Sequence, residues 1–98
     1  MTNTQANRFV GPVIKNGEIG DAVLEAIRED NKGRRIEVEE HASYVRIKVE
    51  KECVIRFDTV SEMLGREATR SDIEANMPSL EGFIRVDSEK MTFLASAG

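Results

Sequence analysis

Hydrophobic and polar residues alternate along this chain with two different periods, and these periods predict its elements. Residues 8–14 form an apolar stretch that is typical of a strand. Because Pro12 has no N–H to donate, this strand is expected at a sheet edge or with a bulge. Residues 16–33 then predict a helix, which Gly33 is suited to end in a left-handed conformation. Its apolar residues recur at helical spacing and form one stripe: Ile19, Val23, Ala26 and Ile27.

Three strands with alternating apolar residues are predicted after this helix. Residues 34–40 and 43–50 alternate with period two, and residues 53–57 do so again after a polar turn at residues 50–52. Side chains at every second position share one face of a strand. The last two strands therefore each present an apolar face, formed by Val45, Ile47 and Val49 and by Cys53, Ile55 and Phe57.

Two short helices are predicted in the second half of the chain. Thr59 is followed three residues later by Glu62, which is the spacing of a capping box, and Gly65 is placed to end that helix. Thr69 is suited to begin the next helix, with Ile73 and Met77 facing inward. Pro78 disfavours helix at the residue before it, so this helix should stop at Met77.

Residues 82–86 and 91–95 complete the pattern as two strands, so the order strand, helix, strand, strand occurs twice. The two repeats, residues 8–50 and 53–95, show no convincing identity between their residues. Each helix has an apolar stripe and each strand an apolar face, which helices packed on a sheet bury in two layers. The prediction is one compact α+β domain over residues 7–98, preceded by a flexible polar tail at residues 1–6.

Composition narrows the class of protein. Of the 98 residues, 40% are hydrophobic and 33% are charged, and the net charge is −4. This acidic balance argues against a nucleic-acid partner, since binding phosphates requires an excess of Lys and Arg. A single cysteine forms no internal disulfide, and we find neither a signal peptide nor an apolar stretch of about 20 residues. A soluble cytoplasmic protein with no membrane partner is therefore expected.

Residues that carry out catalysis are sparse. The single histidine, His41, lies in a predicted exposed turn, whereas a general base needs a nucleophile or a substrate proton within reach. Cys53 lies on an apolar strand face and is interpreted as a small buried hydrophobe. One His and one Cys do not supply a zinc or iron site, and neither a calcium-loop spacing nor a glycine-rich phosphate loop is present. We therefore expect no catalytic residue, no metal site and no cofactor.

Two further groups of residues receive structural interpretations. The basic cluster at residues 32–35 is followed directly by acidic residues, which indicates a solvated helix end rather than an anion site. The aromatic residues lie at strand positions, where the hydrophobic core is the first expectation. These residues are Phe9, Tyr44, Phe57, Phe83 and Phe93.

Longer segments resemble a known family. The segment "LGREATRSDIEANMPSLEGFIRV", residues 64–86, resembles the second half of the effector proteins of bacterial multicomponent diiron monooxygenases. These effectors are also called coupling or regulatory proteins. The segment "NRFVGPVIKNGEIGDAVLEAIREDN", residues 7–31, resembles their first strand and helix, and "YVRIKVE" is similar to their central strand. The "VGP" near the start is more similar to the branch of toluene, alkene and phenol hydroxylases than to the methane enzyme.

The resemblance implies both a fold and a function. The family fold has two β-α-β-β units that meet at an angle, in agreement with the order predicted above. Family members carry no cofactor and are not enzymes; they bind the diiron hydroxylase and tune its oxygen activation, coupling and turnover. A reductase or Rieske ferredoxin belongs to the same system. Two departures are the short segment ahead of Asn7 and Leu80, where several relatives have Phe.

The resemblance and the break at Met77-Pro78 together suggest a docking surface for the hydroxylase. An alternative remains open, because Asn76 and Ser79 are also suited to bind backbone groups that are freed at the break. Rival functions are a small ligand-sensing or inhibitory domain, which requires a ligand-sized pocket, and a metal-dependent enzyme, which requires a bound metal. The candidate interface residues are Phe9, Val10, Gly11, Pro12, Glu74, Asn76, Met77 and Ser79.

Overall fold

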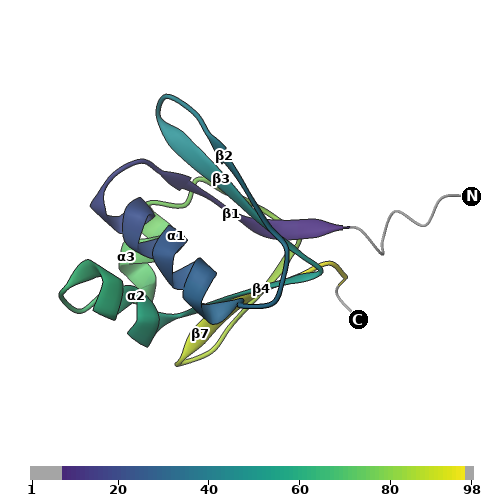
Figure 1. The fold of residues 1–98 in the computed structure, drawn as a ribbon. Helices are drawn as coiled ribbons and strands as arrows, with labels where there is room; N and C mark the ends of the chain where they lie inside the picture. The colour runs from purple at the N-terminus through teal and green to yellow at the C-terminus, as the bar shows by residue number, and fades with distance from the viewer. Residues whose placement is uncertain (1–7, 97–98) are drawn as a thin grey trace, which may run out of the picture.

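The computed structural model describes residues 8–96, which form seven strands and three helices (Figure 1). The predicted tail at residues 1–6 lies outside this described part. The order of elements confirms the two β-α-β-β units, with the second helical stretch split in two and one strand added. In chain order the elements are β1 (Phe9–Lys15), α1 (Glu18–Asp30), β2 (Ile36–Glu40), β3 (Tyr44–Glu50), β4 (Glu52–Arg56), α2 (Phe57–Leu64), α3 (Arg70–Ala75), β5 (Ser79–Glu81), β6 (Phe83–Val86) and β7 (Lys90–Leu94).

The strands of this α+β domain form two antiparallel sheets. The first sheet has the order β2-β3-β1-β5 and the second has the order β4-β7-β6. Figure 1 shows the two sheets diverging from one side of the molecule, with α1 lying between them. Helix α1 packs against both α2 and β4. The two β-α-β-β units are therefore not two separate sheets, because β5 of the second unit joins the first sheet.

The predicted apolar stripe and strand faces form the hydrophobic core. Of the α1 stripe, Val23, Ala26 and Ile27 are fully buried, and Ile19 packs against them at the margin. Lys51 takes a positive φ of 71° in the predicted turn between β3 and β4. The strand residues that belong to the same buried cluster are Val10, Ile14, Val45, Ile47, Val49, Cys53, Ile55, Met91 and Phe93.

Strand β1 contains Pro12 and yet lies inside its sheet, between β3 and β5. The pairing of β1 with β3 keeps one register, from Val10 opposite Val49 to Val13 opposite Arg46, so no residue is inserted. The ladder instead skips Gly11 and Pro12. The expectation of an edge or a bulge is thus wrong. The interruption depends on Gly11, whose φ is +153° and where a Cβ would collide with the carbonyl oxygen of Ile47.

The end of α1 differs from the prediction. The helix ends at Asp30 with Asn31 as its C-cap, and Gly33 takes its left-handed φ of +89° in the turn beyond. The side chain of Asn31 is 2% exposed and donates a hydrogen bond to the carbonyl of Ile27 at 2.8 Å. A polar side chain therefore ends this helix, in a position where it also contacts β4.

One of the two expected helix starts is confirmed. Thr69 caps α3, and its hydroxyl accepts from the N–H of Asp72 while the Asp72 carboxylate accepts from the N–H of Thr69. The capping box at Thr59 is wrong, because α2 already begins at Phe57. The hydroxyl of Thr59 donates instead to Oδ1 of Asp30 at 2.8 Å and ties α2 to the end of α1.

The segment after α3 supplies an outer strand to both sheets. Ser79–Glu81 pairs with β1 as β5, and after Gly82 the chain pairs with β7 as β6. Gly82 has a φ of +104°, and a Cβ there would lie 2.7 Å from both the carbonyl oxygen of Leu94 and Cγ1 of Val10. A glycine is therefore required where the strand passes from one sheet to the other.

Candidate interaction surface

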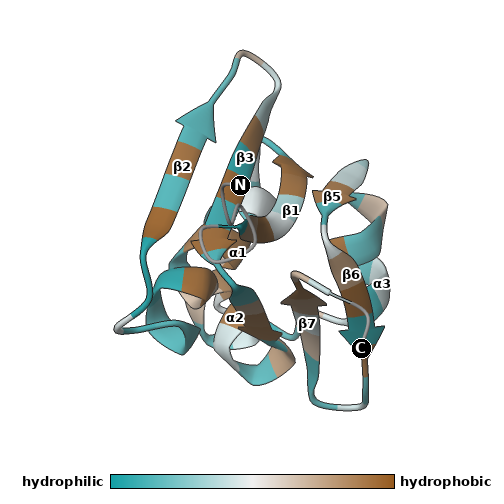
Figure 2. Cartoon of the chain, turned by 90° about the vertical axis from the view of Figure 1, so that its right-hand side faces the viewer, coloured by the Kyte–Doolittle hydropathy of each residue, from teal (hydrophilic) through white to brown (hydrophobic). Residues whose placement is uncertain are grey.

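The two segments of the candidate interface lie side by side in the structure. Strands β1 and β5 are antiparallel neighbours, with Pro12 opposite Leu80 and Val13 opposite Ser79. The N–H of Lys15 also donates to the carbonyl of Asn76 at 2.8 Å. Residues more than 60 positions apart in the chain are thus brought together, as Figure 2 shows for β1 and β5.

The candidate interface residues on β1 are mostly buried. Val10, Gly11 and Pro12 are buried, and Phe9 alone of the four is half-buried. The guanidinium carbon of Arg35 lies 5.9 Å from the centre of the Phe9 ring, in a cation–π contact. Among the four residues 9–12, Phe9 is therefore the one whose side chain is accessible to a partner.

The α3 part of the set offers polar side chains. Glu74 is exposed and accepts from Nε of Arg70 at 2.7 Å. Asn76 is half-buried, and its Nδ2 donates to the carbonyl of Asp72 at 2.8 Å. Met77 packs against the core, whereas Ser79 is exposed. Asn76 thus has the structural bond that the sequence left open as an alternative, which does not prevent it from contacting a partner.

The outer face of the first sheet beside this surface is strongly charged. Nζ of Lys48 lies 2.9 Å from the Glu39 carboxylate, and this contact holds the pKa of Glu39 below its ordinary value. Arg46 lies between Glu39 and Glu81, at 3.9 and 3.7 Å. These ion pairs form a solvated polar face next to β5.

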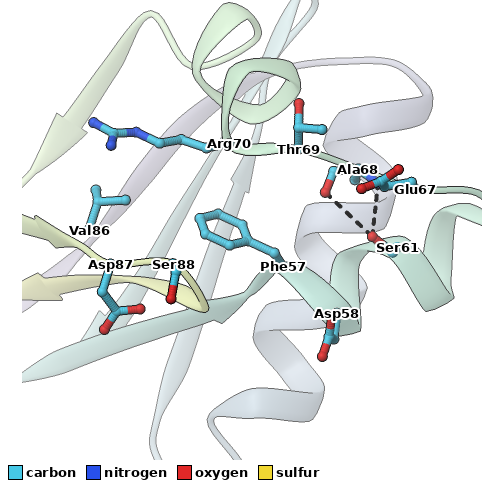
Figure 3. Close-up of a pocket in the computed structure, with 10 residues that line it drawn as sticks. All are labelled: Phe57, Asp58, Ser61, Glu67, Ala68, Thr69, Arg70, Val86, Asp87 and Ser88. Atoms are coloured by element: carbon cyan, nitrogen blue, oxygen red, sulfur yellow. Dashed lines mark hydrogen bonds between the residues drawn. The ribbon is translucent and has the colours of Figure 1, made fainter.

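A groove lies between α2, the loop that follows it and the turn between β6 and β7 (Figure 3). Its volume is about 570 Å³, within the rough range of 300–1,000 Å³ for ligand pockets. Phe57 and Val86 supply apolar surface, and Ser61 binds the N–H of Ala68 at 2.8 Å. The remaining lining is polar or charged, unlike the predominantly apolar lining of ligand pockets: Asp58, Glu67, Thr69, Arg70, Asp87 and Ser88.

The two residues weighed for catalysis occupy the environments that were predicted. His41 is exposed in the turn between β2 and β3 and stacks on Tyr44, with ring centres 4.5 Å apart. Cys53 is fully buried, and burial raises the pKa of its thiol well above the ordinary range. Cys53 is therefore a neutral core residue.

Comparison with known proteins identifies the family. The model of the MmoB/DmpM family matches residues 8–94, which is almost all of the chain. The chain belongs to the MmoB/DmpM family. It is 37% identical over 83 residues to the effector subunit of the alkene monooxygenase system of Xanthobacter autotrophicus, covering 85% of this chain and 82% of that protein.

Solved structures of related proteins share the fold of this MmoB/DmpM member. A chain in the phenol hydroxylase–regulatory protein complex is 26% identical, with a TM-score of 0.77 and coverage of 89% of this chain and 98% of that chain. The regulatory protein B of soluble methane monooxygenase is 25% identical with a TM-score of 0.67. The match covers 91% of this chain but 65% of that protein. No helix in residues 8–96 is long and apolar enough to cross a membrane.

Sequence reasoning missed one surface feature of this family member. Phe83 was expected in the core, yet it is 49% exposed, and the adjacent Ile84 is 37% exposed. Figure 2 shows this apolar segment on β6, which is an edge strand of the second sheet. A signal was present, because neighbouring residues of a strand point to opposite faces. Two consecutive large apolar residues therefore require cover on both faces of the strand.

Proposed function

We propose that this chain is the effector component of a multicomponent monooxygenase and acts by binding the diiron hydroxylase. The observation that carries the proposal is the family match over residues 8–94. Relatives named as an effector subunit and as part of a hydroxylase–regulatory protein complex support it. The parent enzyme is proposed to oxidise an aromatic or alkene hydrocarbon in the cytoplasm.

The proposed mechanism is a shift in the population of hydroxylase states. An effector changes turnover only if it binds one state of its partner more tightly than another. Moving an equilibrium from 1:99 to 99:1 requires about 5.5 kcal/mol of differential binding. A docked face of about 800 Å² on each partner is typical of specific complexes, and a few anchors within it carry most of the binding energy.

The candidate interface is proposed to begin at the junction of β1 and β5. Phe9, Glu74 and Ser79 present side chains there, and Asn76 and Met77 fix the backbone between α3 and β5. Docking at this junction tunes oxygen activation and coupling in the hydroxylase. A reductase or Rieske ferredoxin of the same system supplies the electrons.

The test is a reconstitution of the enzyme system. The hydroxylase and reductase from the same organism are assayed for product formed per NADH consumed, with and without this protein. We expect the effector to raise both the rate and the yield per NADH. If the hydroxylase neither binds this protein nor responds to it, the proposed function is wrong. Binding of a small molecule without any hydroxylase would favour the ligand-sensing alternative.

A further inference from the structure

Three of the four edge strands of the two sheets are protected from pairing with other chains, each in a different way, whereas β6 is not. An open edge pairs readily with other chains unless charges, short length or covering elements prevent it. Strand β2 carries Glu37, Glu39 and Glu40, and β5 has three residues. Strand β4 is covered by α1, since Asn31 binds both backbone groups of Val54. Among the residues that the structure describes, β6 is thus the edge strand with large apolar residues exposed.

The exposed side chains of β6 lie on both sides of its sheet. Phe83 is opposite Leu94 on the outer face, and Ile84 is opposite Phe93 on the face toward the helices. Within residues 8–96, Met63 at 41% is the other large apolar residue with comparable exposure. Aromatic side chains are enriched in protein interfaces, where a few well-packed anchors carry most of the binding energy.

This edge continues the candidate interface. Ser79 lies on β5, and Gly82 joins β5 directly to β6. Figure 2 shows β5 and β6 following one another along the same edge of the molecule, with α3 behind them. The open edge therefore begins at the exit from α3, where Asn76 lies, and extends to Val86.

A second copy of this chain fits the edge poorly. A two-fold pairing of β6 with itself involves only four residues on each chain, far fewer than the 20 to 30 of a typical stable interface. Such pairing also brings Glu81 of one copy toward Asp87 and Glu89 of the other. Like charges that meet across strands are destabilising. A larger partner that contacts β5 and β6 together would cover more of this open edge and of its exposed apolar side chains.

We propose that the hydroxylase docks along the open edge formed by β5 and β6, with the Phe83 side chain as its principal anchor. This inference rests on the proposed function and adds the position of the contact. The Phe83 ring becomes buried against apolar hydroxylase surface, and Ile84 is covered from the opposite face of the strand. The Asn76–Ser79 segment then lies at the rim of this contact instead of its centre.

The experiment compares Phe83→Ser with Met63→Ser in direct binding to the purified hydroxylase of the same organism. Met63 lies on α2 beside α1 residues, and its similar exposure makes it a matched control. We expect Phe83→Ser to raise the Kd at least tenfold and Met63→Ser to change it less than twofold. Phe83→Leu keeps an apolar group on β6 and should give an intermediate Kd. Circular dichroism and the Tm establish that each variant is folded.

The outcomes distinguish the proposed effector function from the proposed position of the contact at Phe83. If wild-type protein binds the hydroxylase and Phe83→Ser binds equally well, the anchor is wrong and the proposed function stands. If wild-type protein does not bind, the proposed function fails. The masses of wild type and Phe83→Ser are also measured by light scattering. A wild-type dimer that Phe83→Ser converts to a monomer, with unchanged hydroxylase affinity, would assign the edge to a second copy and overturn the inference.

Discussion

The side-chain amide of Asn31 pairs with the backbone of Val54 as a neighbouring strand would. Nδ2 of Asn31 donates to the Val54 carbonyl at 2.7 Å, and Oδ1 accepts from the Val54 N–H at 2.8 Å. Next to it, Oδ2 of Asp30 accepts from the N–H of Arg56 at 2.8 Å. The last residue of α1 and its C-cap thus satisfy the outer edge of β4.

Asn31→Ala is expected to destabilise the protein by about 2–3 kcal/mol, since it leaves the part-buried N–H and carbonyl of Val54 without their side-chain partner. The free energy of unfolding is measured by urea denaturation. Asn16→Ala is the control, because the exposed Asn16 amide binds the carbonyls of His41 and Ala42 in a solvated turn. A loss below about 1 kcal/mol for Asn31→Ala would show that water replaces the amide.

Gly82→Ala is expected to be strongly destabilising, by about 3 kcal/mol or more, because strain at positive φ adds to collisions with Leu94 and Val10. Gly33→Ala is the matched control. Gly33 also has a positive φ, of +89°, but a Cβ there meets nothing within 4 Å, so only backbone strain of about 1 kcal/mol remains. Urea denaturation of both variants tests this. An equal loss in the free energy of unfolding for the two variants would mean that the backbone around residue 82 shifts enough to accommodate a methyl group.

Cys53→Ser should lower stability by about 1–3 kcal/mol, since it buries a hydroxyl among apolar groups. The folded fraction of the variant should still support hydroxylase coupling, which is measured as product per NADH. Loss of coupling in well-folded Cys53→Ser protein would contradict the structural role of this residue.

The same variant tests the pH dependence that follows from the raised pKa of the Cys53 thiol. In the unfolded chain a thiol ionises above pH about 8.5, whereas folded Cys53 keeps its proton. The unfolded state therefore binds fewer protons, and wild-type stability falls as the pH rises above about 8.5. Serine lacks this ionisation. The stability difference between wild type and Cys53→Ser should narrow by at most about 1.4 kcal/mol per pH unit, as measured by urea denaturation between pH 7.5 and 10.

Asn76→Ala is expected to weaken hydroxylase stimulation and to lower stability by about 1 kcal/mol, because it removes the bond to the Asp72 carbonyl. Stimulation is measured at effector concentrations corrected for the folded fraction. Asp72→Asn is not a suitable control, because the Asp72 carboxylate is part of the capping box of α3. Asn16→Ala is the control, because it removes an exposed side-chain amide that binds the carbonyls of His41 and Ala42. Unchanged affinity and turnover in folded Asn76→Ala protein would leave this residue with a structural role only.

Local patterns in the sequence predicted the elements whose residues interact within a few positions. The α1 stripe and the strand faces of β3 and β4 were found because burial follows the helical and strand periods. The cap at Thr69 was found because its partner lies three residues away. At Thr59 the same kind of motif misled, because its hydroxyl bonds to Asp30, 29 residues earlier.

The errors concern contacts that a local pattern does not contain. The position of Pro12 inside a sheet depends on Gly11 and on a close approach by Ile47 of another strand. Strand β5 was missed because three residues after a proline show no period. The sequence predicted Phe9 and the residues at the exit from α3 as part of the candidate interface, but it assigned Phe83 to the hydrophobic core. The two consecutive apolar residues Phe83 and Ile84 indicated that both faces of the strand need cover, but the position of β6 at the end of a sheet, which leaves Phe83 exposed, is given only by the strand order.

The passage of the chain at Gly82 also determines how the two halves of the molecule depend on each other. The eight residues 79–86 complete one sheet with β5 and the other with β6. The first half of the polypeptide thus lacks one strand of its own sheet, because a fragment that ends after β3 does not contain β5. The second half contains all three strands of the other sheet together with β5. Because β5 and β6 follow one another through Gly82, a displacement of this one segment moves the outer strands of both sheets.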